Sequence, residues 1–179
     1  MPYVAELPAG EAAYCPACGA ALTDRPDRSP TCSECSLTLY RNPVPMGRVA
    51  VVEGDSVLLV ELGVDAGSWA LPGGRLEPAD PSPRAGAARE LAEETGLVVD
   101  PDALSYLGEG ALDFGDGVEL VSYNYAVARA DTDGTVAAAD DAADARFWSR
   151  ERLRSDPPLA RAAGPEQLLA AIDEFGMEG

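Results

Sequence analysis

The segment from Ser82 to Gly96 constrains this chain more than any other, because it carries the marks of both ends of a helix. Ser82 is a good N-cap residue, Pro83 fits the first helical position, and Gly96 fits the position after the last turn. One side of the helical wheel is apolar or small and can pack inward. Its residues are Ala88, Leu91, Ala92 and Thr95. The sequence therefore predicts a helix that lies against another layer of the fold.

The stretches around this helix predict a layered α/β domain of strands and a few helices. Strand-like patterns occur at 47–52, 56–61, 97–99, 104–107 and 118–130, and residues 68–77 resemble a short strand that runs into a double-glycine turn. We also expect an acidic, alanine-rich loop at 131–145, a short helix near Glu151, and a C-terminal helix at 165–175.

Three glutamates share one stripe of the predicted helix. Glu90, Glu93 and Glu94 stand at positions i, i+3 and i+4, so they fall in one narrow sector of the wheel. Their mutual repulsion would destabilise an isolated helix, and a divalent cation would remove that cost. Mg²⁺ binds carboxylate oxygens together with water and substrate phosphates. The alternative interpretation is a solvated acidic face, which the helical wheel alone does not exclude.

The sequence around the helix resembles the box of the Nudix hydrolase family, G-x5-E-x7-R-E-U-x-E-E-x-G-U, where U is a bulky aliphatic residue. The second half of that pattern is fully present from Arg89 to Leu97. The preceding Trp69-Ala-Leu-Pro-Gly-Gly74 resembles the family's lead-in. The first half departs from the pattern, since Asp80 holds its acidic position and eight residues, not seven, separate Asp80 from Arg89. The loop thus carries one extra residue, and the contribution of Asp80 stays open.

The resemblance implies a Nudix-like α/β/α sandwich with a mixed sheet, and hydrolysis of the diphosphate bond in a nucleoside diphosphate linked to another group. It implies a small-molecule nucleotide substrate and catalytic Mg²⁺ or Mn²⁺. The ligands of that metal would be Glu90, Glu93 and Glu94, one of which could instead act as general base. Arg89 would orient these glutamates. The Gly73 carbonyl would add a metal ligand, with Gly74 beside it.

Other side chains are candidates for the same site. A further acid from a distant loop would complete it, and the candidates are Asp140, Asp141 and Asp144. Tyr123 and Tyr125 could stack on a purine, but an aromatic stripe on a strand more often faces a core. Trp69 is expected to pack under the double glycine. Arg48 and Arg75 either meet phosphates or serve as surface or bridging arginines.

Four cysteines form two Cys-x2-Cys pairs, at Cys15 and Cys18 and, after 13 intervening residues, at Cys32 and Cys35. This spacing is typical of a tetrahedral four-thiolate zinc site. The alternatives are two disulfides, which need an oxidising compartment, or a redox pair, which normally stands alone. A closed four-thiolate site leaves no open coordination position, so its Zn²⁺ would be structural.

A four-cysteine ribbon followed by Tyr40-Arg-Asn-Pro43 resembles the zinc-ribbon subgroup of the family. That subgroup includes NADH pyrophosphatases and ADP-ribose or FAD pyrophosphatase-like enzymes. Residues 98–179 lack the S-Q-P-W-P-F-P signature of the NADH enzymes, so the resemblance favours an ADP-ribose-like substrate. The alternatives are a nucleoside triphosphate pyrophosphohydrolase and a non-enzymatic nucleotide-sensing regulator. We expect a lead-in and zinc ribbon at 1–43 and a Nudix hydrolase domain at 44–179.

The charge composition limits the partners of this chain. It has 31 acidic and 13 basic residues, a net charge of −18, and every basic residue is arginine. Such a surface repels nucleic acid and anionic lipid, so we expect neither as a partner. No run of about 18 apolar residues or secretory signal is visible, which predicts a cytoplasmic protein. The sequence does not specify the oligomeric state, although dimers are common in the family and a homodimer is an option.

The same composition resembles that of haloarchaeal proteins. High salt would screen the self-repulsion of so acidic a surface, because the Debye length falls to about 3 Å at 1 M salt. We therefore predict adaptation to a high-salt cytoplasm. The alternative is an acidic protein from a GC-rich genome.

Overall fold

The computed structural model describes residues 3–4, 13–22, 31–39, 43–63, 67–113, 119–155 and 164–176. Internal contacts divide the chain into two compact units. One unit combines Met1–Val44 with Asp113–Glu119, and the other combines Pro45–Leu112 with Leu120–Gly179. Most of the expected lead-in, and Tyr40, Arg41 and Asn42 of the motif after the cysteines, lie outside the described residues.

Within the described residues, the larger sheet has seven strands. They are β3 (Val44–Glu53), β4 (Ser56–Leu62), β5 (Trp69–Ala70), β6 (Gly73–Arg75), β7 (Ser105–Asp113), β8 (Glu119–Ala128) and β9 (Ala142–Ser149). The order along the sheet is β5-β4-β3-β8-β7, while β6 pairs with β3 and β9 pairs with β4. Both of those additional pairings are antiparallel. The short strand β6 thus brings the double glycine beside the start of β3.

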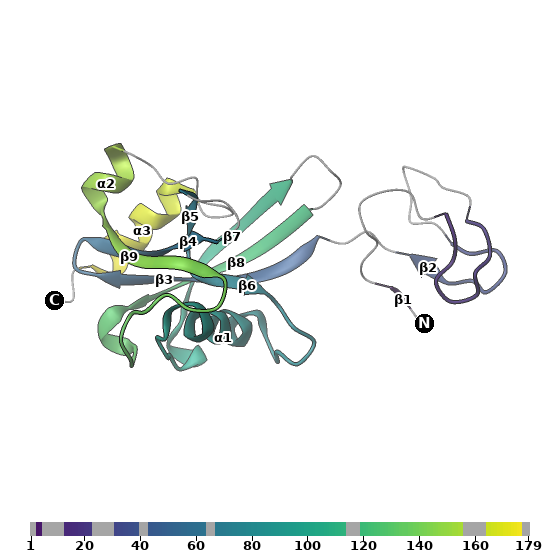
Figure 1. Cartoon of the computed structure of the whole chain (residues 1–179), viewed down its shortest axis with the longest axis horizontal. Helices are drawn as coiled ribbons and strands as arrows, with labels where there is room; N and C mark the ends of the chain where they lie inside the picture. The colour runs from purple at the N-terminus through teal and green to yellow at the C-terminus, as the bar shows by residue number, and fades with distance from the viewer. Residues whose placement is uncertain are drawn as a thin grey trace. The chain divides into compact units, whose positions relative to one another are not determined.

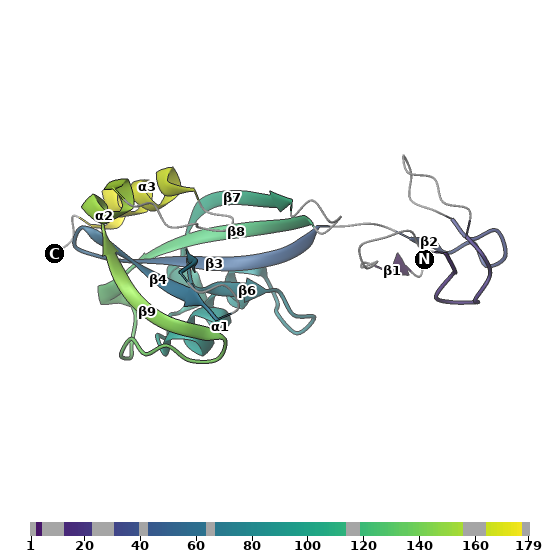
Figure 2. The same ribbon diagram turned by 45° about the horizontal axis from the view of Figure 1, so that its top comes forward.

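Helices cover both faces of this sheet, as Figures 1 and 2 show. The helix α1 (Pro83–Thr95) lies on one face, and α2 (Arg150–Ser155) and α3 (Pro165–Phe175) lie on the other. The predicted ends of α1 are confirmed, because the Ser82 hydroxyl accepts a hydrogen bond from the Ala85 amide and Gly96 is left-handed at φ 71°. No helix in the described ranges has the length and apolar character needed to span a membrane.

Two apolar clusters hold the layers together, one on each face of the sheet. Along β3, Ala50 and Val52 join the cluster that includes Leu168 of α3. Their neighbours Val49 and Val51 join the cluster that includes Leu91 of α1. Alternate residues of a strand point to opposite faces, so an unbroken apolar run serves both layers. The expected α/β/α sandwich is confirmed.

Three of the sequence-based boundaries are corrected. Residues 97–99 form no regular strand, since only Val98 pairs there, in an isolated bridge with Asp133. The strand expected at 104–107 extends over Ser105–Asp113 as β7. The loop expected at 131–145 is shorter, because β9 begins at Ala142 and pairs with β4. Pairing with an available strand outweighs the weak local strand preference of an alanine- and aspartate-rich segment.

Candidate functional site

The helix α1 presents the three glutamates in a stripe that runs from buried to exposed. This glutamate stripe consists of Glu90, Glu93 and Glu94. Glu94 is 5% exposed, Glu90 is half-buried, and the side chain of Glu93 is 46% exposed. Glu94 is buried because it lies on the arc of the helix that meets the sheet, along with Ala87 of the apolar cluster. The stripe therefore faces the sheet at one end and water at the other.

A double-glycine loop, residues 71–74, lies directly against this stripe. The Gly73 amide donates a hydrogen bond to Oε2 of Glu94 at 2.7 Å. A Cβ at Gly74 would come within 2.5–2.7 Å of the Glu90 carboxylate, so only glycine leaves that space open. Gly73 itself has φ +143°, and a Cβ there would overlap the Arg48 backbone and the Gly47 carbonyl. The structure thus brings both predicted glycines next to two of the predicted glutamates.

Arg89 joins two members of the stripe. Its NH1 donates to Oε1 of Glu90 at 2.9 Å and to Oε2 of Glu93 at 2.7 Å. Its NH2 also donates to the Arg75 carbonyl at 3.1 Å. Hydrogen bonds to a nearby acid, Asp80, and to these glutamates raise the pKa of the guanidinium, which stays protonated. Arg89 is therefore placed to fix the directions in which these carboxylates point.

Asp80 binds the other side of the same guanidinium, despite the extra residue in its loop. The Nε of Arg89 donates to Oδ1 of Asp80 at 3.2 Å, and NH2 donates to Oδ2 at 3.1 Å. Oδ2 also accepts the Glu77 amide at 2.7 Å, within a turn in which the Asp80 amide donates to the Glu77 carbonyl. Asp80 thus reaches Arg89 from a loop one residue longer than the family pattern. Hydrogen bonds from Arg89 hold the pKa of Asp80 below its ordinary value.

Burial changes the acidity of the two inner glutamates. It raises the pKa of Glu90, and the charges of Glu93 and Asp141 add to that rise against the opposing effect of Arg89. It raises the pKa of Glu94 to about 8, although the Gly73 amide and the positive charge of Arg48 favour the ionised form. Burial is therefore the main reason that Glu90 and Glu94 bind protons more tightly than an ordinary glutamate, and the neighbouring carboxylates add to it.

Among the three candidate distal acids, Asp141 is the one that acts on the stripe. Its charge raises the pKa of both Glu90 and Glu94. Asp144 instead pairs with Arg146. A distal loop, residues 132–141, is held against the end of α1, where the Ala137 and Ala139 amides donate to helix carbonyls at 2.9 and 3.0 Å. This attachment, which has no signal in the sequence, brings Asp141 toward the glutamates.

The aromatic and arginine candidates take other places. Tyr125 is 6% exposed and belongs to the cluster under α1, as a core interpretation predicts. Trp69 is buried in the opposite cluster. Arg75 is exposed, but Arg48 is buried, and its NH1 donates to the Leu71 carbonyl at 2.8 Å. Arg48 is therefore a bridging arginine inside the protein and not a surface contact for phosphate.

The four cysteine sulfurs lie within 4.8 Å of one another. Cys15 and Cys35 are 3.6 Å apart at sulfur, as are Cys18 and Cys32. Tetrahedral bonds of about 2.3 Å to zinc place sulfurs roughly 3.8 Å apart, whereas a disulfide needs about 2.05 Å. The arrangement is compatible with a zinc ribbon and leaves these cysteines free of disulfides.

Two similar backbone turns build this cysteine cluster. In the first, the Gly19 amide donates to the Cys15 carbonyl at 2.8 Å, and in the second the Ser36 amide donates to the Cys32 carbonyl at 2.9 Å. Burial opposes ionisation of Cys15, but hydrogen bonds from backbone amides outweigh it and lower the pKa of that thiol to about 7. Contacts with the other thiols and burial instead raise the pKa values of Cys18 and Cys35, so the four thiols of the metal-free cluster differ in acidity.

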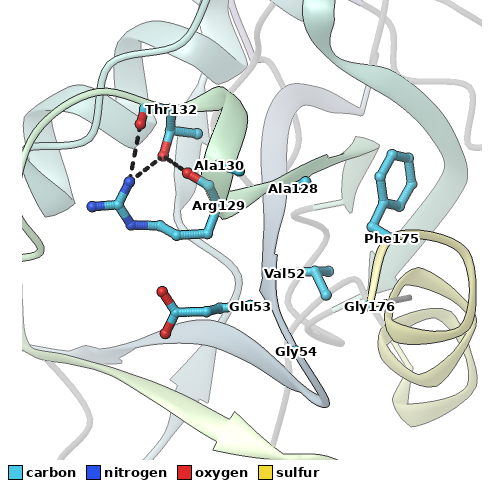
Figure 3. Close-up of a pocket in the computed structure, with 9 residues that line it drawn as sticks. All are labelled: Val52, Glu53, Gly54, Ala128, Arg129, Ala130, Thr132, Phe175 and Gly176. Carbon is cyan, nitrogen blue, oxygen red and sulfur yellow. Dashed lines mark hydrogen bonds between the residues drawn. The ribbon is translucent and has the colours of Figure 1, made fainter. Parts of the chain in front are cut away.

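A pocket of about 360 Å³ lies away from all of these groups (Figure 3). It is lined by the turn between β3 and β4, the end of β8, and the end of α3 near Phe175. Arg129 at its edge donates to the Thr132 carbonyl at 3.0 Å and to the Gly134 carbonyl at 2.7 Å. This arginine thus stabilises the turn at 129–134, and the pocket contains none of the predicted site residues.

The sequence and the fold of this chain were compared with those of known proteins. Residues 44–171 match the family model of the NUDIX domain. A MutT-like protein from Streptomyces ambofaciens is 49% identical over 55 residues, which cover 31% of this chain and 35% of that protein. The aligned region therefore spans about a third of that relative's length.

Solved structures share the fold. A NUDIX hydrolase from Nitrosomonas europaea superposes with a TM-score of 0.61 at 19% identity, over 90% of each chain. A bifunctional NMN adenylyltransferase/ADP ribose pyrophosphatase from Francisella tularensis, complexed with AMP and a manganese ion, gives 0.58 at 23% identity, over 75% of this chain and 42% of that chain. Since the family model covers most of the chain and the glutamate helix lies in a matching fold, this protein belongs to the Nudix hydrolase family.

Proposed function

We propose that this protein hydrolyses the diphosphate bond of a nucleoside diphosphate linked to another group, in a reaction that requires Mg²⁺ or Mn²⁺. The observation that carries the proposal is the contact between the glutamate stripe and the double-glycine loop. Glu90 and Glu94 lie directly against Gly74 and Gly73, and Arg89 binds Glu90 and Glu93. Carboxylates grouped in this way are the ligands that Mg²⁺ prefers.

The donor chemistry of these side chains supports the proposal, and so does the space beside one of them. Glu90, Glu93 and Glu94 would hold the metal, with the Gly73 carbonyl as a further ligand. The absent Cβ at Gly74 leaves room beside the Glu90 carboxylate, which any other residue would fill. When bound, Mg²⁺ neutralises the diphosphate and lowers the pKa of a coordinated water. A substrate that is itself anionic needs such neutralisation before it can approach a chain of net charge −18.

The chain's own groups supply orientation and a base. Arg89 holds Glu90 and Glu93 in fixed directions, and Asp80 holds Arg89 from the other side. One of the three glutamates would act as the general base in place of binding the metal, and the buried Glu94, with its raised pKa, is one candidate for that role. Asp141, whose charge acts on Glu90 and Glu94, is a second candidate.

The preferred substrate in this proposal is ADP-ribose or a close relative. The ribbon ahead of the Nudix box resembles the ADP-ribose and FAD pyrophosphatase-like subgroup, and a structural neighbour named for ADP ribose pyrophosphatase activity shares the fold. We further propose that 1–43 forms a lead-in and structural zinc ribbon, and that 44–179 is the catalytic domain. The family match from residue 44 supports that division.

A substrate panel with Mg²⁺ or Mn²⁺ tests this function. We expect ADP-ribose to yield AMP and ribose 5-phosphate, and the products can be separated by anion-exchange chromatography. Turnover of nucleoside triphosphates alone, with release of pyrophosphate, would contradict the substrate proposal and support the triphosphate alternative. No metal-dependent turnover with either class would contradict hydrolysis and support a nucleotide-sensing protein.

A further inference from the structure

Among the residues that the structure describes, only two formally charged side chains are buried, and they carry opposite charges. Arg48 on β3 is 4% exposed and Glu94 on α1 is 5% exposed. Both lie against the double-glycine loop, Arg48 through the Leu71 carbonyl and Glu94 through the Gly73 amide. A charge inside a protein is costly unless it is hydrogen-bonded and paired, so this placement needs an explanation.

Arg48 touches the loop at two points. Its NH1 donates to the Leu71 carbonyl at 2.8 Å. Its Cγ and Cα lie so close to Gly73 that a Cβ there would come within 2.8 and 2.6 Å of them. Arg48 and Gly73 are also paired across β3 and β6 in the sheet register. Arg48 thus contacts the double-glycine loop at Leu71 and again at Gly73.

Arg48 directly precedes the buried apolar part of β3. Residues Val49, Ala50, Val51 and Val52 follow it as an unbroken buried apolar run. An apolar residue at position 48 would continue that run and would avoid burying a charge. The guanidinium instead donates to a loop carbonyl only two residues before the amide that binds Glu94. The position of Arg48 therefore matters to the loop more than to the core.

We propose that Arg48 is a positioning residue of the metal site, which holds the double-glycine loop so that the Gly73 amide orients the Glu94 carboxylate. Arg48 acts on the site through its contacts with Leu71 and Gly73 and through its positive charge near Glu94, and its burial keeps it from the substrate. This inference rests on the proposed metal-dependent hydrolysis. It goes beyond that function in assigning a role to a residue outside the Nudix box.

Arg48→Met tests the proposal, because methionine keeps an unbranched side chain of similar length and removes the donors and the charge. Arg48→Lys keeps the charge but lacks the planar fork of the guanidinium. Arg154→Met is the matched control, as Arg154 is exposed on α2. Mn²⁺ binding to each protein is measured by electron paramagnetic resonance without substrate, and thermal unfolding is followed with and without Mn²⁺.

We expect Arg48→Met to weaken Mn²⁺ binding about 10-fold or more and to reduce the rise in melting temperature that Mn²⁺ produces. At saturating metal, kcat falls about 10- to 100-fold, while KM for the nucleotide stays within about threefold because Arg48 does not reach it. Arg48→Lys recovers part of the Mn²⁺ affinity, and Arg154→Met behaves like the wild type.

Unchanged Mn²⁺ affinity and kcat in the folded Arg48→Met protein, with only a lower melting temperature, would overturn the proposal. A large rise in KM at constant kcat would overturn it too, since that result indicates substrate contact. If Arg48→Met does not fold, Arg48→Lys decides by the same criteria, and failure of both to fold makes Arg48 merely structural. A wild type that neither binds Mn²⁺ nor hydrolyses any diphosphate contradicts the proposed function itself.

Discussion

Asp80 and Arg89 are joined side to side, with both carboxylate oxygens of Asp80 accepting hydrogen bonds from the Arg89 guanidinium at 3.2 and 3.1 Å. The opposite edge of the guanidinium binds Glu90 and Glu93. One arginine thus links an acid from the preceding loop to two acids of α1. The bidentate geometry fixes the plane of the guanidinium and, through it, the glutamates.

Replacing Asp80 by asparagine should loosen this arrangement. Asp80→Asn removes one negative charge and one acceptor from Arg89, so we expect kcat to fall about 10-fold and the free energy of unfolding to drop by about 1–3 kcal/mol. Steady-state kinetics and urea unfolding measure the two effects. Asp102→Asn, an exposed position in the 3-10 turn after α1, is the control and should change neither. Wild-type kcat in Asp80→Asn would mean that Arg89 needs no support from the loop.

Glu93→Gln should abolish most activity and leave the fold intact. The side chain of Glu93 is 46% exposed and binds Arg89 at the surface of α1, so the substitution leaves the core intact. We expect kcat to fall at least ~100-fold, about 2.7 kcal/mol of transition-state stabilisation. Circular dichroism checks the fold, and Glu166→Gln, exposed at the start of α3, is the control. Near-normal turnover in Glu93→Gln would exclude this glutamate from the metal site.

The stability of the metal-free protein should fall as pH rises toward 8. The pKa of Glu94 is about 8 in the folded chain against an ordinary 4.5, so the folded state binds more protons than the unfolded state between these values. The contribution of protonated Glu94 to the free energy of unfolding is fully present below about pH 4.5 and is lost as pH rises through 8. Melting temperatures in EDTA from pH 5 to 9 measure this dependence. Glu94→Gln should flatten the profile, and an unchanged slope would refute the assignment.

Cys32→Ser should release zinc and disorder the cysteine cluster. Cys32 is buried in a small core with Cys15, Leu37 and Leu39, and in our proposal Zn²⁺ supplies most of the stability of so small a core. Elemental analysis of the wild type should give one zinc per chain. The catalytic domain should survive, because its two apolar clusters contain no residue of the ribbon. Ser33→Ala is the control, and two disulfides found by mass spectrometry would contradict the zinc assignment.

Molar KCl should raise the melting temperature above its value at low salt. The chain carries a net charge of −18, and salt screens the repulsion that this charge creates in the compact state. A series of melts in KCl, with a choline chloride series to separate screening from specific K⁺ binding, measures the effect. A melting temperature that stays flat across the series would favour a merely acidic protein.

The sequence predicted the parts of this molecule that depend on local order. The limits of α1 follow from Ser82, Pro83 and Gly96, whose side chains and backbone preferences act within one turn. The cysteine spacing likewise predicted a cluster that needs only two short turns. Each prediction held because the residues concerned are close in the chain.

Other features depended on contacts between distant segments and could not be predicted. β9 forms at Ala142–Ser149 because β4 offers a partner, although its first residues resemble a loop in composition. Asp80 binds Arg89 from a loop one residue longer than the family pattern, in a turn closed by the hydrogen bond from its amide to the Glu77 carbonyl. The burial of Glu94 depends on where α1 meets the sheet, which the helical wheel does not determine.

The attachment of the distal loop to α1 also sets how that loop can move. The Ala137 and Ala139 amides bind the Thr95 and Glu94 carbonyls, so these loop hydrogens are covered by the end of the helix itself. Amides in a segment without regular structure usually exchange with deuterium quickly, whereas these two exchange only when the loop separates from the end of α1. Exchange of the Ala137 and Ala139 amides therefore measures how often the loop that carries Asp141 separates from α1.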